Sequence, residues 1–219
     1  MTTTRRRLIR KGIARLLLAP PGLALLFASA CGGGVAVGEQ ADPVQFRNVV
    51  NAGSDLDYNP STSPNQLVQD ADAIVVGRVV DIQEAKQLYE DGAAERFAIL
   101  EVIVERVIDG ELRGDDASTV FVAMYVSQIS AWSDIRASVP LDRGLFVLTD
   151  LADWNYSGRL EGFPGIAYFP RPDGLWFEDV AGKPAGVWAE LADVEIRWGV
   201  EFNTLDELVA TLEDAAAKE

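Results

Sequence analysis

The sequence predicts a mainly β domain with some helical content, built as a small, strongly curled β-barrel. Two observations lead to this fold class. Apolar runs of strand length, rich in β-branched residues, recur between residues 73 and 178. One of them, residues 96–108, is longer than an ordinary strand. At about 3.3 Å per residue it would extend about 43 Å, so we expect it to bend around a barrel.

The first predicted elements are a short helix and a strand. Ser63 followed by Pro64 is a typical pair for the N-cap and first turn of a helix, which we expect to run through Ala71. Residues 73–82 form a β-branched run of strand length. Gly77 interrupts this run, and an isolated glycine inside a strand indicates a bulge or a bend.

The long strand and the helix after it form the centre of the predicted domain. Within residues 96–108, apolar side chains fall on one face, whereas Glu101 and Glu105 fall on the other. A third strand is predicted over residues 119–126. Apolar residues at helical spacing then predict a short helix within residues 127–138.

The last third of the chain is predicted to contain strands and a C-terminal helix. Residues 144–149 are a fourth strand, and residues 166–178 are predicted to form a hairpin around a Pro-Arg-Pro-Asp-Gly turn. Thr204 and Glu207 form a capping box that starts the final helix. Its apolar stripe consists of Leu205, Leu208, Val209 and Leu212.

Three strands, a helix and two or more further strands are the element order of a five-stranded OB-like barrel. Residues 71–80 and 107–110 also resemble a widespread, little-characterised domain of secreted bacterial proteins. This resemblance implies a small curled β-barrel and carries no known catalytic residues. A β-sandwich or another α+β fold is the alternative.

The first 30 residues have the organisation of a signal peptide. They contain six of the 19 basic residues and none of the 34 acidic ones. An apolar run over residues 16–28 follows the basic stretch, and the small residues Ser29 and Ala30 come next. The run is shorter than the roughly 18 to 20 residues that cross a bilayer. We therefore expect export rather than a membrane span.

Cys31, the only cysteine, stands directly after this small-residue site. Residues 28–31, Ala-Ser-Ala-Cys, resemble the lipobox of bacterial lipoproteins, although Ala28 replaces the larger aliphatic residue usual there. The resemblance implies that Cys31 is lipidated; ordinary secretion with a coincidental cysteine is the alternative. Arg5, Arg6 and Arg7 also resemble the twin-arginine export signal, and a Sec-type signal is the alternative.

Together these features predict three segments. Residues 1–30 are the signal peptide, and residues 31–63, rich in Gly, Asn, Asp, Ser and Pro, are a flexible tether. Residues 64–219 form a single β-rich domain, which is long enough to bury a core of its own.

Composition excludes several kinds of chemistry. The chain has no histidine, which excludes Ser-His-Asp and Cys-His nucleophile systems and histidine-ligated metals. An Asp-x-Asp-x-Asn run at residues 55–59 resembles the start of a calcium loop, but Pro60 and Gln66 occupy the positions of the required Gly and Glu. We therefore expect no metal site and no cofactor.

The chain beyond residue 30 has 13 basic and 34 acidic residues, a formal charge of −21. Such a domain repels phosphates, so nucleic-acid binding is not expected. Six aromatic residues of the last third can form a ligand platform or fill the core, and core filling is favoured. They are Trp154, Tyr156, Tyr168, Trp176, Trp188 and Trp198.

The function predicted from the sequence is that of a non-catalytic binding or accessory protein. We expect it on the outer face of the cell membrane, held there by lipid at Cys31, with an envelope protein or glycan as partner. Acidic headgroups would repel the domain while acyl chains retain it. The alternative is a carboxylate-dependent envelope hydrolase resembling a glycosidase, but no spacing singles out two carboxylates. No catalytic residue is assigned.

Overall fold

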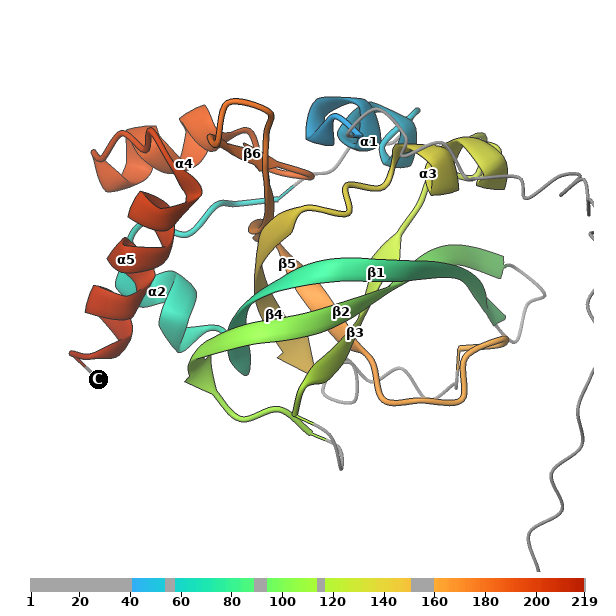
Figure 1. The fold of residues 1–219 in the computed structure, drawn as a ribbon, viewed down its shortest axis with the longest axis horizontal. Helices are drawn as coiled ribbons and strands as arrows, with labels where there is room; N and C mark the ends of the chain where they lie inside the picture. Colours follow the sequence, from blue (N-terminus) through green and yellow to red (C-terminus); the bar gives the residue numbers. More distant parts are fainter. Residues whose placement is uncertain (1–40, 54–57, 89–93, 114–116, 151–159, 219) are drawn as a thin grey trace, which may run out of the picture. The chain divides into compact units, whose positions relative to one another are not determined.

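The computed structural model describes residues 41–53, 58–88, 94–113, 117–150 and 160–218. The described part is mainly β with additional helices, which confirms the predicted fold class (Figure 1). Its elements are α1 (Pro43–Val50), α2 (Pro64–Gln69), β1 (Ala73–Leu88), β2 (Ala94–Gly110), β3 (Thr119–Tyr125), α3 (Trp132–Ser138), β4 (Arg143–Asp150), β5 (Tyr168–Glu178), β6 (Pro184–Gly186), α4 (Leu191–Trp198) and α5 (Leu205–Ala216).

The described strands form one sheet that curls partly into a ring. Along the sheet the order is β3-β2-β1-β4-β5-β6, and these neighbours are all antiparallel. The first strand in this order, β3, also pairs with β5 in parallel, where Val122 is opposite Tyr168. The sheet thereby closes partly into a ring, and α3 lies between β3 and β4 in the chain, as the sequence predicts.

Side chains on opposite faces of the strands belong to two separate cores. Val75 lies in the core inside the curled sheet, whereas its neighbours Ile74 and Val76 lie in a second core on the outer face. Phe146 and Leu145 are divided between the two cores in the same way. Because successive strand residues point to opposite faces, this arrangement explains why these strands are apolar at every position rather than at alternate ones.

The long hairpin of β1 and β2 bends at irregularities in its pairing. Register shifts occur between Ile74 and Val75, between Val76 and Gly77, and between Val79 and Asp81. A Cβ atom at Gly77 would lie 2.5 Å from the carbonyl oxygen of Ile103, so only glycine permits this close approach. The bulge predicted at Gly77 is confirmed.

The C-terminal helix α5 covers the outer core as its sequence predicts. The hydroxyl of Thr204 accepts a hydrogen bond from the amide of Glu207 at 3.2 Å, which confirms the helix cap. The predicted apolar stripe is buried against the outer face of the sheet and against α2, whose predicted cap at Ser63 is also present. These helices therefore complete the second core.

The helix α1 occupies part of the segment predicted to be a tether. Asp42 caps it by accepting a hydrogen bond from the amide of Val44 at 2.9 Å. Its Phe46 and Val50 are buried in the inner core, where Phe46 packs edge-on against Phe177 with ring centroids 6.1 Å apart. Residues 43–50 thus pack as part of the folded domain, which differs from the predicted start at residue 64.

The predicted hairpin at residues 166–178 is wrong. The chain does not reverse there but continues through β5, with residues 171–174 bulging out of its pairing with β4. Asp173 in this bulge is buried and accepts a hydrogen bond from the amide of Ser61 at 2.6 Å. Arg171 lies 3.5 Å from the carboxylate of Asp70. These contacts hold the proline-containing segment out of the sheet, and a local turn rule cannot anticipate them.

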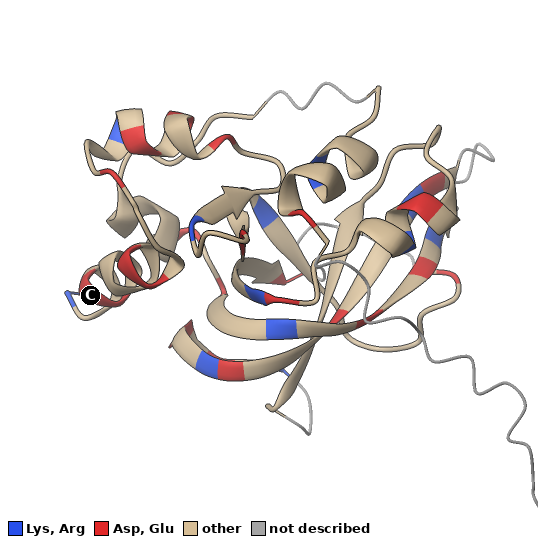
Figure 2. Cartoon of the chain, turned by 45° about the horizontal axis from the view of Figure 1, so that its top comes forward, with Lys and Arg blue, Asp and Glu red and all other residues tan. Residues whose placement is uncertain are grey.

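Positively and negatively charged residues occur close together along the long strands (Figure 2). Arg78 contacts Glu105 at 2.6 Å, and Arg96 contacts Glu84 at 3.0 Å. Within the described part of the chain, no helix has the length and apolarity needed to cross a membrane.

Candidate functional site

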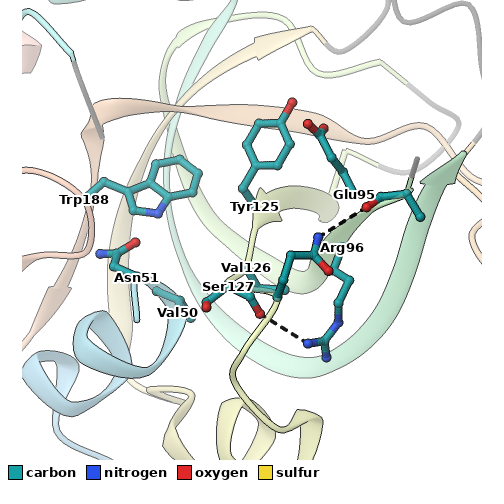
Figure 3. Close-up of a pocket in the computed structure, with 10 residues that line it drawn as sticks. Val50, Asn51, Glu95, Arg96, Tyr125, Val126, Ser127 and Trp188 are labelled. Atoms are coloured by element: carbon teal, nitrogen blue, oxygen red, sulfur yellow. Dashed lines mark hydrogen bonds between the residues drawn. The ribbon is translucent and has the colours of Figure 1, made fainter. Parts of the chain in front are cut away.

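A pocket of about 490 Å³ lies where β2 begins and β3 ends (Figure 3). Four segments that are distant in the sequence form its walls: the end of α1, the start of β2, the end of β3 with the residues after it, and the segment after β6. Its lining residues are Val50, Asn51, Ala94, Glu95, Arg96, Tyr125, Val126, Ser127, Gln128 and Trp188.

Strand alternation separates the two charged residues of this lining. Glu95 precedes the buried Phe97 by two residues on β2, and therefore shares the inward face of the strand with it. Arg96 belongs to the opposite face. In Figure 3 the Glu95 carboxylate and the Arg96 guanidinium extend in opposite directions.

The positive charge of Arg96 is used in structural contacts. Its Nε lies 3.0 Å from a carboxylate oxygen of Glu84. Its Nη1 donates hydrogen bonds to the carbonyl oxygens of Ser127 and Ser130 at 3.2 and 2.8 Å.

The aromatic wall of the pocket consists of rings that support one another. Tyr125 lies opposite Phe97 across the β2–β3 pairing, with ring centroids 4.5 Å apart. Phe169 of β5 contacts Tyr125 edge-on at 5.0 Å and stacks against Trp188 at 5.8 Å. Because Phe97 and Phe169 are buried, they hold the Tyr125 and Trp188 rings in fixed positions.

Hydrogen bonds attach α1 to the rest of the pocket. The amide of Ser127 donates to the carbonyl oxygen of Val50 at 2.8 Å, and the Ser127 hydroxyl donates to the carbonyl oxygen of Ala52. The side-chain amide of Asn51 donates to the carbonyl oxygen of Val187, next to Trp188, at 2.8 Å. The wall contributed by α1 is therefore fixed relative to β3 and to the segment that carries Trp188.

The structure describes four of the six aromatic residues singled out in the last third of the chain, and these pack in or against its cores. Tyr168 and Trp176 are buried, and the indole of Trp198 donates a hydrogen bond to the carbonyl oxygen of Ser61 at 3.1 Å. Among the four of these residues that the structure describes, Trp188 alone lines the pocket. The predicted lipidation residue Cys31, the residues Trp154 and Tyr156, and the aspartates of the calcium-like run, Asp55 and Asp57, lie outside the described residues.

The pocket lining has the chemistry of recognition. Tyr125 and Trp188 supply ring surface, Asn51 and Gln128 supply amides, and Glu95 supplies a carboxylate. Glycoside hydrolysis by the usual route needs two carboxylates flanking the scissile bond. Among the residues described, no group of three or more acidic or cysteine side chains could hold a metal ion. Within the described lining there is one carboxylate of the pair that hydrolysis needs.

Sequence reasoning missed Asn51, Glu95 and Tyr125, which line the pocket. Asn51 follows α1, which lies in the segment predicted to be a tether, so it had no predicted position in the domain. The sequence holds a weak signal for Glu95, because Glu95 continues the alternation that places Phe97 on the inward face. Strand pairing brings Glu95 and Tyr125 into one pocket with Trp188, and the alternation within one strand does not specify that pairing.

The sequence matches no protein-family model and no curated protein sequence.

Proposed function

We propose that this protein is an exported lipoprotein whose domain binds a ligand of the cell envelope or its surroundings in the pocket beside β2 and β3. Lipid at Cys31 holds it on the outer face of the membrane. The protein binds without catalysing a reaction. The observation that carries this proposal is the pocket itself, whose aromatic and amide side chains are fixed by buried neighbours.

The proposed location rests on the N-terminal sequence. A basic stretch, an apolar run and small residues precede the only cysteine of the chain. The formal charge of −21 beyond residue 30 is consistent with a domain kept away from anionic headgroups. In this arrangement the acyl chains retain the protein, while repulsion leaves its pocket accessible.

The proposed binding role rests on rigidity and composition. A ligand that enters a preformed pocket does not have to order the side chains that contact it, which reduces the entropy lost on binding. Here the rings are held by Phe97 and Phe169, and α1 is held by Ser127 and Asn51. Among the described lining residues Glu95 is the single carboxylate, whereas the alternative hydrolase requires a pair.

The anchor is tested by fractionating cells that express the Cys31→Ser variant. We expect the wild-type protein in the membrane fraction and the variant in the soluble extracytoplasmic fraction, because only the thiol can carry the lipid. Metabolic labelling with a fatty-acid analogue provides the second readout. A variant that stays in the membrane, or a wild-type protein that takes up no label, would refute the anchor.

The pocket is tested by photo-crosslinking in intact cells. A photoreactive amino acid replaces Gln128, an exposed residue of the pocket lining, or Val180, which is 78% exposed and does not line the pocket. We expect adducts specific to position 128, which disappear when Trp188→Leu is combined with it. Equal adducts at both positions would show that the pocket is not the binding surface.

A further inference from the structure

We propose that the ligand group bound in this pocket is a neutral sugar unit, with one hydroxyl held between the indole N–H of Trp188 and the side-chain carbonyl oxygen of Asn51. The proposal rests on the proposed function in that both use the same pocket. It adds the chemical class of the ligand, which the proposed function leaves open. It does not depend on the lipid anchor.

Asn51 presents a hydrogen-bond acceptor to the pocket. Its Nδ2 donates to the carbonyl oxygen of Val187 at 2.8 Å. Only the nitrogen of the side-chain amide can make that contact, because a carbonyl oxygen accepts hydrogen bonds and does not donate them. The Oδ1 atom therefore faces away from Val187. Within the described part of the chain nothing donates to Oδ1, and the atom is open to solvent rather than enclosed.

Trp188 presents a hydrogen-bond donor to the same pocket. Its side chain is 8% exposed and stacks on Phe169, so it offers the pocket an edge rather than an open face. Among the described residues no group accepts a hydrogen bond from its indole N–H, and this nitrogen is not enclosed, unlike that of Trp176. In Figure 3 the nitrogen lies on the edge of the ring that is nearer to Asn51.

A neighbouring donor and acceptor select for a hydroxyl. A hydroxyl accepts a hydrogen bond through its oxygen and donates one through its hydrogen, so a single group can satisfy both Trp188 and Asn51. A carboxylate only accepts and an ammonium only donates, so each would leave one of the two protein groups unpaired, which costs affinity. A sugar combines hydroxyls with apolar C–H surface, and Val50 and Val126 supply apolar lining for that surface.

The backbone of the pocket favours a sugar over an extended peptide. Peptides commonly bind by adding a strand, which requires backbone groups that have no partner in the protein. Here the amide of Val126 donates to the carbonyl oxygen of Arg96 at 3.1 Å, and the amide of Ser127 donates to that of Val50 at 2.8 Å. Side chains therefore make the recognition. The volume of about 490 Å³ falls within the range of small-molecule sites.

Charge restricts the sugar to a neutral one. The chain beyond residue 30 has a formal charge of −21, and the field of such a domain repels anions. The two charged side chains of the lining already have partners. Arg96 contacts Glu84 and two carbonyl oxygens, and Glu95 also takes part in an interaction within the protein. The groups that remain for recognition are uncharged.

The experiment measures binding of sugar probes by calorimetry to the full chain in a polyoxyethylene detergent, which carries no sugar headgroup. The neutral probes are cellotetraose, maltotetraose and tetra-N-acetylchitotetraose, and the anionic probe is tetragalacturonic acid. We expect at least one neutral probe to bind with a Kd of about 1 mM or lower, and the anionic probe to bind at least about tenfold more weakly. No heat from any neutral probe at about 10 mM would refute the inference.

An isosteric replacement locates the binding. Trp188 is replaced by β-(3-benzothienyl)alanine, which keeps the shape of the indole but has sulfur in place of the N–H. We expect the Kd of the binding tetrasaccharide to rise about threefold to tenfold, because one neutral hydrogen bond is lost. The same replacement at Trp176 is the matched control, because among the described residues nothing pairs with that buried nitrogen and the ring lies outside the pocket lining. Binding to the control should stay within about twofold of the wild type.

Monodeoxy forms of the binding tetrasaccharide test the contact with Asn51. The form that lacks the paired hydroxyl loses its contacts to both Trp188 and Asn51. We therefore expect it to bind the wild type more weakly than the intact sugar binds the protein replaced at Trp188. Its Kd should be the same for these two proteins within about twofold, because the N–H has no hydroxyl left to contact. If every monodeoxy form still lost affinity on replacement of Trp188, the pairing would be wrong.

Two further results would overturn the inference. An equal rise in Kd for the two tryptophan replacements would place the sugar elsewhere on the protein. Crosslinks from position 128 to a cellular protein, with no tetrasaccharide bound, would identify a peptide ligand, which would end the sugar proposal but sustain the proposed function. Conversely, sugar binding that depends on Trp188, without crosslinks at position 128 in cells, would sustain this inference and remove support for the proposed function.

Discussion

The indole ring of Trp188 stacks on the phenyl ring of Phe169, with centroids 5.8 Å apart and planes inclined by 26°. Phe169 also contacts Tyr125 and Phe97, with centroids 5.0 and 6.4 Å away. One buried ring of β5 therefore supports the aromatic wall of the pocket from behind. It connects the stability of the inner core to the shape of the site.

Replacing Phe169 by leucine should lower stability and binding together. Each aromatic pair contributes about 0.5–1.5 kcal/mol beyond the area it buries, and this substitution removes three. We expect the free energy of unfolding in urea to fall by about 1–3 kcal/mol. Phe121→Leu is the control, because Phe121 is paired with Phe163 outside the pocket lining. Unchanged ligand binding in folded Phe169→Leu would contradict this supporting role.

The helix α1 should be required for a stable domain. Phe46→Ala removes a fully buried ring from the inner core, and we expect it to lower the free energy of unfolding by about 3–5 kcal/mol. Val44→Ala on the same helix is the control, since Val44 is 39% exposed and its loss should change stability by less than about 0.5 kcal/mol. Equal urea midpoints for the two variants would mean that α1 is dispensable.

Gly77 should not tolerate a side chain. In Gly77→Ala the new Cβ atom would lie 2.5 Å from the carbonyl oxygen of Ile103, so the β1–β2 pairing must shift. We expect a loss of about 1–3 kcal/mol in the free energy of unfolding. Gly182 has a φ of +78° but open space around it, and asparagine tolerates that conformation. Gly182→Asn should therefore remain close to wild type in thermal unfolding.

Tyr58 should make stability fall at alkaline pH. Burial, followed by the charges of Asp193, Asp173 and Glu190, raises the pKa of Tyr58 from 10.0 to about 12. Among the described residues, none hydrogen-bonds its buried hydroxyl. Above pH 10 the unfolded chain loses this proton first, so the pKa difference lowers stability as the pH rises from 10 towards 12.

The measurement compares urea midpoints of the wild type and Tyr58→Phe at pH 8, 10 and 11. The gap between the two proteins should stay constant from pH 8 to just below 10. Above pH 10 the urea midpoint of the wild type should fall relative to that of Tyr58→Phe, because the variant has no phenol to ionise. A gap independent of pH up to 11 would show that the phenol ionises equally well in the folded protein.

The sequence predicted elements whose signals are local. The bend at Gly77 and the cap formed by Thr204 and Glu207 depend on neighbouring residues, and both are present. The curled sheet followed from the length of the segment that became β2, because a strand of that length does not fit an ordinary flat sheet. Periodicity and composition were sufficient for these features.

The errors concern segments whose conformation depends on distant contacts. Asp42 and Pro43 are a valid helix start, but eight residues of helix are stable only because Phe46 enters the inner core. The prolines of β5 indicate a turn in isolation, whereas the contacts of Asp173 and Arg171 hold them in a bulge. The pocket could not be predicted for the same reason, because its lining residues come from segments that are distant in the sequence.

The attachment of α1 determines when folding can finish. The hydrogen bond from Asn51 to Val187 joins residues 136 positions apart, so it forms only after nearly the whole chain is present. Contacts of such sequence separation slow folding, because the connecting chain must be ordered before they add stability. By this argument α1 is among the last elements to dock, and the pocket does not exist before that step.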